Sequence, residues 1–182
     1  NKNFNGRIEH IKSLSLLKRD GIMCLDAFTI RNLEIFQSLS TQGIHGTLVD
    51  TIDQTITGFG SRLLKNWLRQ PLTDTEKINE RLDRISECID KPKMLEILKS
   101  NLKETSDLER IIARVANGKA NPRDVINAGN TLAKLPIIQK AVKKGSHVLK
   151  QLVSQCANTA PITQSILSTI QEDPPATTQN GR

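Results

Sequence analysis

Residues 23–72 read MCLDAFTIRNLEIFQSLSTQGIHGTLVDTIDQTITGFGSRLLKNWLRQPL, and this stretch decides how the rest of the chain is interpreted. Asp26 stands where a helix N-cap belongs, because its carboxylate can accept hydrogen bonds from the free N–H groups of the following turn. Apolar residues then recur at helical spacing, which predicts a helix that continues to about Leu39. Gly43 and Gly46 would end that helix and open a turn.

Residues 47–57 are the part of this stretch for which the sequence predicts extended structure. They read TLVDTIDQTIT, are rich in β-branched side chains and contain one good helix former, Leu48. The expected fold class is therefore mainly α, with a short β segment near residues 47–56. Asp50 and Asp53 are predicted to be solvent-side or turn residues, because two carboxylates without further ligands make a poor metal site.

A second helix is predicted after Thr57, with its apolar residues on one side and its end at Pro71. Trp67 lies on this apolar side and is the only tryptophan of the chain. Aromatic residues make up only 3% of the sequence, whereas a base-stacking platform needs several of them. Trp67 is therefore predicted to belong to the core, together with Leu33, Leu63, Leu64, Leu82, Ile111 and Ile112.

Helix-start and helix-stop signals divide the remainder of the chain. Thr73-x-x-Glu76 and Ser106-x-x-Glu109 have the pattern of capping boxes, in which a hydroxyl and a carboxylate satisfy two free N–H groups. Gly118 is expected to close a helix in the left-handed conformation. Asn121-Pro122-Arg123-Asp124 is a further start signal, with Asn121 as the cap and Pro122 at the first helical position. The sequence predicts at least six amphipathic helices in one domain.

The net charge of +7 is concentrated in the C-terminal third of the chain. Residues 125–171 contain five lysines and no acidic residue, namely Lys134, Lys140, Lys143, Lys144 and Lys150. A basic helical surface can attract DNA phosphates, although lysines on a solvated face are the more common case. Both interpretations stay open from the sequence. Residues 172–182 are rich in Pro, Thr, Gln and Asn and are expected to be a flexible tail.

Several classes of function are not supported by the residue pattern. No apolar run is long enough to span a bilayer, and no signal-peptide pattern is present. The three cysteines are widely spaced, which predicts reduced thiols in an intracellular protein. The three histidines stand alone, so spacing supports neither a zinc site nor a catalytic pair. We expect no catalytic, cofactor-binding or metal-binding residue in this chain.

The same residues resemble the core domain of the MutS DNA mismatch-repair family. Matching phrases occur in family order at Leu25-Asp26, Thr29 with Asn32-Leu33-Glu34-Ile35, Thr47-Leu48, Asp53-x-Thr55-x-Thr57, Gly60-Ser61-Arg62-Leu63-Leu64, Trp67-Leu68 and Pro71-Leu72. The resemblance continues through Ile78-x-x-Arg81-Leu82, Asp107-Leu108-Glu109-Arg110, Arg114 and Asn121-Pro122-Arg123-Asp124, fades after about Pro136, and returns weakly at Asp173-Pro174-Pro175. Its structural signature is Asp26, Asn32, Arg62, Trp67, Arg110, Pro122, Arg123 and Asp124. Arg62, Arg110 and Arg123 are candidates to pair with Asp26, Asp107 or Asp124.

This resemblance implies a piece of a longer protein. Proteins of the family hydrolyse ATP with a Gly-rich loop that ends in Gly-Lys-Ser/Thr, and mismatch readers insert the phenylalanine of a Phe-x-Glu motif; the sequence contains neither. Residues 1–22 would be the end of the connector domain or a linker, residues 23–171 the first half of the helical core, and residues 172–182 a tail leading toward the DNA clamp. ATP, magnesium, mismatched duplex DNA, a dimer partner and mismatch-repair accessory proteins would belong to the longer protein, a DNA-dependent ATPase.

Two alternatives to a mismatch-repair core stay open. A stand-alone helical module that binds a protein partner would show the same periodicity. A MutS homologue of the recombination branch would have a similar core and would differ in modules that this sequence does not contain.

Overall fold

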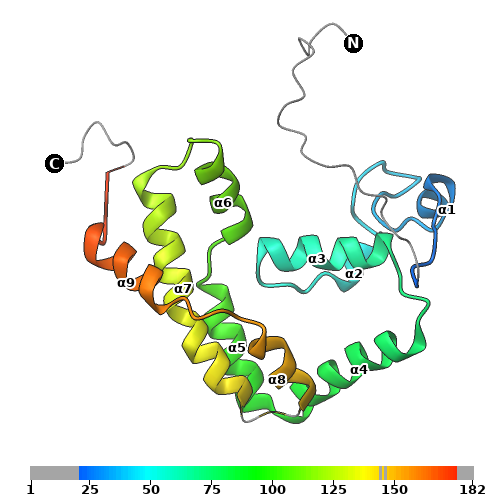
Figure 1. The fold of residues 1–182 in the computed structure, drawn as a ribbon. Coiled ribbons are helices and arrows are strands. Elements are labelled where there is room, and N and C mark those ends of the chain that lie inside the picture. The colour runs from blue at the N-terminus through cyan, green and yellow to red at the C-terminus, as the bar shows by residue number, and fades with distance from the viewer. Residues whose placement is uncertain (1–20, 144, 146, 176–182) are drawn as a thin grey trace, which may run out of the picture.

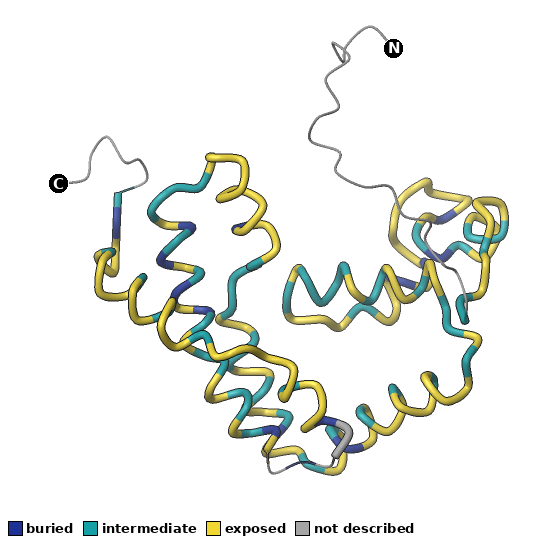
Figure 2. Tube along the Cα trace, in the orientation of Figure 1, coloured by how far each residue is buried: buried dark blue, intermediate teal, exposed yellow. Residues whose placement is uncertain are grey.

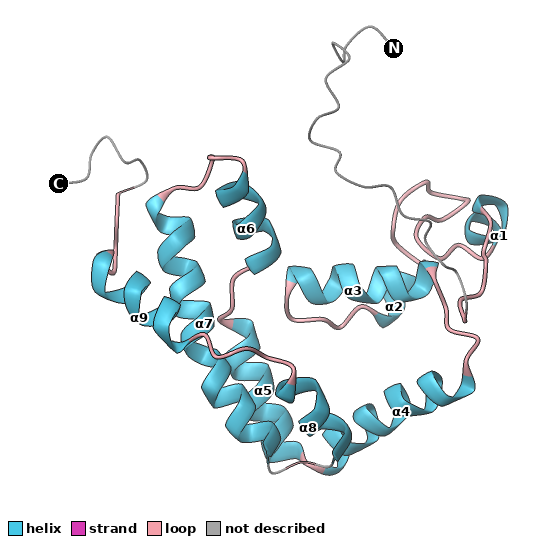
Figure 3. Cartoon of the chain, in the orientation of Figure 1, coloured by secondary structure: helices cyan, strands magenta, loops and turns pink. Residues whose placement is uncertain are grey.

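The computed structural model describes residues 21–143, 145 and 147–175. These residues form helices and connecting loops, and no strand is assigned among them. The helices form an open, curved arrangement in which α4 connects an N-terminal unit to a helical bundle (Figure 1). Figure 3 shows the same helices joined by loops. An isolated antiparallel bridge between Ile22 and Leu72 closes the N-terminal unit. None of the helices in the described ranges combines the length and apolarity that a membrane crossing requires.

The elements follow one another along the chain in two groups. The N-terminal unit contains α1 (Ala27–Asn32), α2 (Leu48–Ile52) and α3 (Gly58–Arg69), and α4 (Thr75–Asp90) leads away from it. The bundle contains α5 (Pro92–Lys103), α6 (Leu108–Ala116), α7 (Pro122–Lys143), α8 (His147–Ser154) and α9 (Ala160–Thr169). The long α7 is the centre of the bundle, because it contacts α5, α6, α8 and α9.

The first helix begins where the sequence predicts and ends much earlier. Asp26 accepts a hydrogen bond of 2.7 Å from the Thr29 N–H, which confirms the cap. The prediction that this helix continues to Leu39 is wrong, because α1 ends at Asn32. Glu34 has a φ of 46°, which breaks the helix, and its carboxylate accepts from the Leu39 N–H at 2.5 Å. The side chain of Glu34 thus stabilises a loop instead of a further helical turn.

The β segment predicted near residues 47–56 is also wrong, because Leu48–Ile52 form the helix α2. Thr47 caps it by accepting from the Asp50 N–H at 3.2 Å. The N–H groups of Leu48 and Val49 donate to carbonyls of the preceding loop at 3.1 and 3.0 Å, and Val49 is only 1% exposed. A cap, these loop hydrogen bonds and burial together outweigh the β propensity of the local sequence.

Both predicted capping boxes are displaced by one residue. The caps are Asp74 and Asp107 rather than Thr73 and Ser106. Asp74 accepts from two N–H groups of α4 at 3.0 and 3.3 Å, and Asp107 accepts from the Arg110 N–H at 3.4 Å. An ionised carboxylate also interacts favourably with the positive end of the helix dipole, which a hydroxyl does not.

Two other boundary predictions are confirmed. Asn121 caps α7 by accepting from the Asp124 N–H at 2.8 Å, and the Asp124 carboxylate accepts from the Asn121 N–H at 3.1 Å in return. Pro122 is the first residue of α7. Gly118 follows α6 with a φ of 63°, the left-handed conformation that the sequence predicts there.

The buried residues are few and most of them lie in the bundle, as Figure 2 shows. One cluster joins Met94, Val142 and Leu149 from α5, α7 and α8. At another point α7 and α9 approach closely, because a Cβ added at Gly129 would lie 2.7 Å from Ile166 Cγ2. The bundle is therefore held together around α7.

The predicted core is only partly confirmed. Ile111 is buried and Leu64 is half-buried, whereas Leu33, Leu63, Leu82 and Ile112 are exposed on the surface of the structure. Trp67 is 38% exposed and is not a core residue here. The apolar stripes predicted from Gly58 onward lie on helices, whereas the stripe predicted over residues 25–39 does not, because α1 ends at Asn32. The open arrangement leaves several of these apolar side chains without a covering element among the described residues.

Candidate functional site

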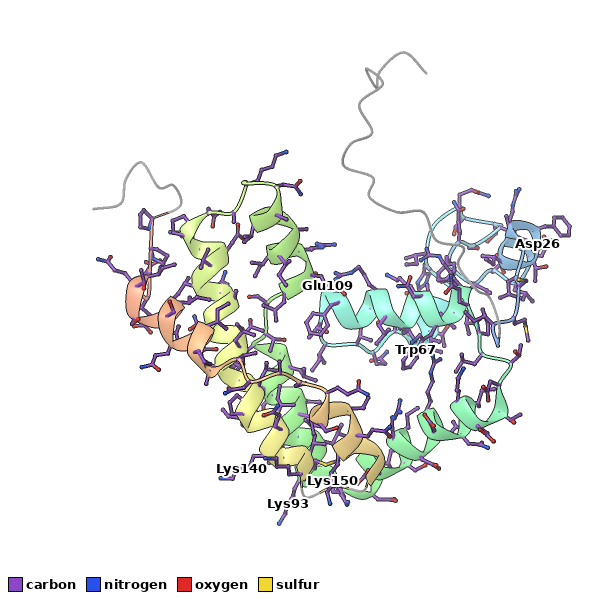
Figure 4. The ribbon with its side chains drawn as sticks, viewed as in Figure 1. Asp26, Trp67, Lys93, Glu109, Lys140 and Lys150 are labelled. Atoms are coloured by element: carbon purple, nitrogen blue, oxygen red, sulfur yellow. The ribbon has the colours of Figure 1, made fainter. Side chains whose placement is uncertain are left out.

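A set of ion pairs bridges the N-terminal unit and the bundle. Arg62 on α3 donates to both carboxylate oxygens of Asp107, at 2.5 and 3.0 Å, and to Glu109 Oε2 at 2.9 Å. Arg110 Nε lies 3.3 Å from Asp107 Oδ2. We call these four residues the Arg62 junction. Figure 4 shows Glu109 next to the N-terminal end of α3, although the two lie far apart in the sequence.

The electrostatics of the junction centre on Asp107. Hydrogen bonds from Arg62 are the main cause that lowers the pKa of Asp107, and the Arg110 N–H and the charges of both arginines act in the same direction. The pKa of Arg62 is raised by its two carboxylate partners. Because Asp107 is also the N-cap of α6, one carboxylate ties α3 to the first turn of a bundle helix.

An open cavity of 390 Å³ lies beside the junction. Its walls come from α3, α5, α6, α7 and the connection between α5 and α6, and include Phe59, Leu63, Leu102, Leu135 and Ile138. The apolar faces of α3 and the bundle therefore face each other without close packing. The approach of α3 to the bundle depends on polar contacts, which tolerate small displacements better than an interlocked core does.

Two further contacts fix α3 on its other sides. Arg81 of α4 stacks on Trp67, with its guanidinium carbon 4.0 Å from the ring centroid. Asp53 accepts from the hydroxyl groups of Ser61 and Thr55, both at 2.5 Å, and these bonds lower the pKa of Asp53. Trp67 thus joins α3 to α4 on the surface. Asp53 is the half-buried C-cap of α2 rather than a turn or solvent-side residue. Asp50 is exposed, as predicted, but lies in the first turn of α2 and accepts from the Gly46 N–H at 3.0 Å.

The predicted arginine–aspartate pairs are confirmed in part. Arg62 and Arg110 both pair with Asp107. Arg123 does not pair with any of the three predicted aspartates, because it reaches the Pro174 carbonyl at 3.0 Å and Asp173 at 3.7 Å. Asp124 pairs instead with Arg114 at 2.6 Å, and Asp26 caps α1 and has no ion pair with another described residue. The sequence predicts which charged residues form ion pairs but not which residue pairs with which. The partner of a long side chain depends on how the helices pack in the folded chain.

The four described lysines of residues 125–171 differ in their surroundings. Lys134 pairs with Glu104 across α5 and α7, and its side chain is only 22% exposed. Lys140 and Lys143 are exposed in the last turn of α7, where they complement the negative end of the helix dipole, and Lys150 is exposed on α8. Lys144 lies outside the described residues. The proximity of these lysines to DNA stays a prediction.

Sequence reasoning missed Lys93, which the antiparallel pairing of α5 and α7 brings beside Lys140 (Figure 4). Lys93 lies outside the basic segment that the sequence singled out. Lys93 lies near Lys140 because α5 packs against α7. The spacing of residues in the sequence does not predict which two helices pack together.

Comparisons with known proteins point to one family. A family model described as MutS domain III matches residues 28–182. The DNA mismatch repair protein MutS of Christiangramia forsetii is 37% identical over 176 residues, which are 96% of this chain and 20% of that protein. The proteins of the same name from Desulforamulus reducens and Methanosarcina mazei are 38% and 34% identical over 96% of this chain. The chain spans about a fifth of the length of these relatives.

Proposed function

The chain belongs to the MutS family of DNA mismatch-repair proteins, and from this premise we propose that residues 23–171 are the first half of a helical core that relays conformational change between a DNA clamp and an ATPase. Relatives named as mismatch-repair proteins favour this role over a stand-alone interaction module or a recombination-branch core. Residues 1–22 and 172–182 would connect the core to neighbouring parts of a longer protein.

The observation that carries the proposal is the Arg62 junction. A relay needs two bodies that keep their internal structure and a contact between them that can change. The bundle around α7 is one such body. The unit of α1 to α3 is the other, because the Val49 N–H donates to the Ile35 carbonyl and the Ser61 hydroxyl donates to Asp53. They are bridged by ion pairs over an open cavity rather than by a packed interface. Displacement of α3 would therefore act on the first turn of α6 through Asp107.

The chemistry of ATP would reside outside these 182 residues. The sequence has no Gly-rich loop with the lysine and hydroxyl that hold nucleotide phosphates and magnesium. ATP and magnesium, mismatched duplex DNA, a dimer partner and accessory proteins would be bound by the longer intracellular protein. This chain would contribute the mechanical link between those sites.

A chimera tests the proposed relay. The 176 matching residues of the Christiangramia forsetii relative are replaced with this chain, and binding of a mismatched duplex and its ATP-dependent release are followed by fluorescence anisotropy. We expect the chimera to bind the duplex and to release it with ATP. Arg62→Gln in the chimera should leave duplex binding in place and slow the ATP-dependent release, because α3 is no longer tied to α6.

Lys119→Gln is the matched control, because Lys119 is exposed in the connection from α6 to α7 and belongs neither to the Arg62 junction nor to the lining of the cavity beside it. Arg62→Lys should retain part of the effect of arginine, since lysine keeps the charge but loses the two-pronged geometry. Release at the same rate with Arg62→Gln as with the unmodified chimera would contradict the proposed relay.

A further inference from the structure

A second hollow, distinct from the cavity beside the Arg62 junction, opens between the start of α5 and the end of α7. Its volume is 710 Å³, and its lining is mostly apolar. Met94 forms the buried floor, while Ile97 and Ile137 are 42% and 49% exposed along it. Two antiparallel helices with apolar side chains between them form a groove of the shape that a third helix fills in a bundle. We call it the α5–α7 groove.

The charge around the groove has one sign. Lys91, Lys93 and Lys140 lie on its rim. Lys91 is already paired with Glu87 at 2.7 Å, whereas Lys93 and Lys140 have no ion pair among the described residues. Figure 4 shows Lys93 and Lys140 extending from the same end of the bundle. Glu96, on the same helix, lines a separate hollow instead.

The backbone adds to this positive charge at the start of α5. The helix begins at Pro92 after Lys91, which provides no side-chain hydrogen bond as a cap. The first N–H groups of such a helix carry a partial positive charge and favour an acidic group nearby. At the opposite side of the groove, Lys140 and Lys143 offset the negative end of α7. The groove therefore combines an apolar floor with a cationic rim.

We propose that the α5–α7 groove binds an amphipathic helix of a partner protein, with apolar side chains inserted between Ile97 and Ile137 and acidic residues facing Lys93 and Lys140. Recognition of this kind uses apolar anchors at i, i+3 or i+4, and i+7 on the bound helix. Duplex DNA fits the groove less well, because its backbone offers no apolar side chains for the floor and requires many more phosphate contacts than two unpaired lysines provide. The proposal is independent of the relay proposed above.

A designed peptide provides the test on the whole 182-residue chain. The probe is a fluorescein-labelled helical peptide of about 15 residues, with leucines at i, i+4, i+7 and i+11 and glutamates on both sides of the leucine stripe. Fluorescence anisotropy should show saturable binding that weakens as salt is added. A peptide with the same composition in scrambled order, and one with lysine in place of each glutamate, should bind on the order of tenfold more weakly.

Variants of the chain locate the binding site. Lys93→Gln with Lys140→Gln should weaken binding on the order of tenfold, since two rim ion pairs are lost. Ile97→Asp should weaken binding at least as much, because it places a negative charge in the apolar groove, close to the leucines and the negatively charged glutamates of the peptide. Lys99→Gln with Lys103→Gln is the matched control, because both lysines of this pair line the separate hollow on α5. Circular dichroism confirms that each variant keeps its helices.

A peptide that carries a photo-crosslinking group in its leucine stripe gives a readout that does not depend on variants. We expect it to attach to residues 92–97 or 137–141. Attachment elsewhere, no binding of the acidic peptide, or equal binding of the lysine peptide would overturn the proposal. Binding of a duplex oligonucleotide that is lost with Lys93→Gln and Lys140→Gln, without peptide binding, would assign the surface to DNA instead. Self-association of the chain that Ile97→Asp abolishes, measured by sedimentation, would assign it to a second copy.

Discussion

Gly129→Ala offers a quantitative test of the packing between α7 and α9. The added Cβ would lie 2.7 Å from Ile166 Cγ2 and 3.2 Å from Leu167 Cδ2, so α9 or its side chains must shift. Alanine is favoured over glycine inside a helix by about 1 kcal/mol. Overpacking of a close contact costs about 1 to 3 kcal/mol. The two effects oppose each other, and the structure predicts a net loss of about 0 to 2 kcal/mol in the free energy of unfolding.

Urea unfolding followed by circular dichroism measures this change, and a second substitution identifies its cause. Ile166→Ala removes the Cγ2 atom that the new methyl group meets, so the two substitutions should be coupled favourably in a double-mutant cycle. Gly118→Ala is the control, because it should destabilise the chain by backbone strain rather than by a steric clash. Its φ of 63° is unfavourable for alanine, and nothing lies within 4 Å of the added Cβ. It should show no coupling to Ile166→Ala. A gain of the full helix propensity of about 1 kcal/mol in Gly129→Ala would refute the close approach of α9.

Three further predictions concern the surface contacts of the structure. Arg81→Ala should cost about 0.5 to 1 kcal/mol and shift the fluorescence of Trp67, and a buried-type emission maximum that is unchanged by the substitution would contradict the stacked, partly exposed ring. Asp107→Asn should destabilise the chain at neutral pH, and the difference should shrink as the pH falls below 3.8, the ordinary pKa of this carboxylate, because its folded-state pKa is lowered. Denaturant titrations across that range measure this change, and a difference that stays constant down to the lowest pH would contradict it. Matched and mismatched duplexes titrated at two salt concentrations should bind equally and weakly, at about 10⁻⁴ to 10⁻⁶ M or not at all, and a mismatch preference at physiological salt would show that these 182 residues read the mismatch themselves.

Some local signals in the sequence predict the local structure correctly, whereas both capping boxes place the cap one residue too early. The caps at Asp26 and Asn121, the proline at the start of α7 and the left-handed Gly118 each depend on a few neighbouring residues, and all four are confirmed. The loop and short helix in residues 33–52 could not be predicted in this way. Their conformation depends on hydrogen bonds from Leu48 and Val49 to the preceding loop, and the helical pattern of residues 25–39 contains no sign of that contact.

Burial and charge pairing were harder to predict because they depend on distant elements. Ile111 and Ile112 are adjacent and equally apolar, yet the first is 7% and the second 64% exposed. Arg123 pairs with Asp173 rather than with its neighbour Asp124, because the chain after α9 returns to the start of α7. The sequence predicts part of the Arg62 junction, because Arg62 and Asp107 are both candidates for an ion pair. Their pairing requires α3 to reach α6, which no sequence spacing specifies.

The distribution of packing suggests where this structure can change shape. At Gly129 the bundle has no room for one methyl group, so α7 and α9 must move together. Between α3 and the bundle a cavity of 390 Å³ remains, and the described contacts across it include the bidentate pair of Arg62 with Asp107. Ion pairs on a partly exposed surface are weak and can exchange partners. Glu109 and Arg110 beside this pair provide such alternative partners. A small displacement of α3 with its unit would change the contacts of the Arg62 junction and leave the internal packing of the bundle unchanged, which is the property that the proposed relay requires.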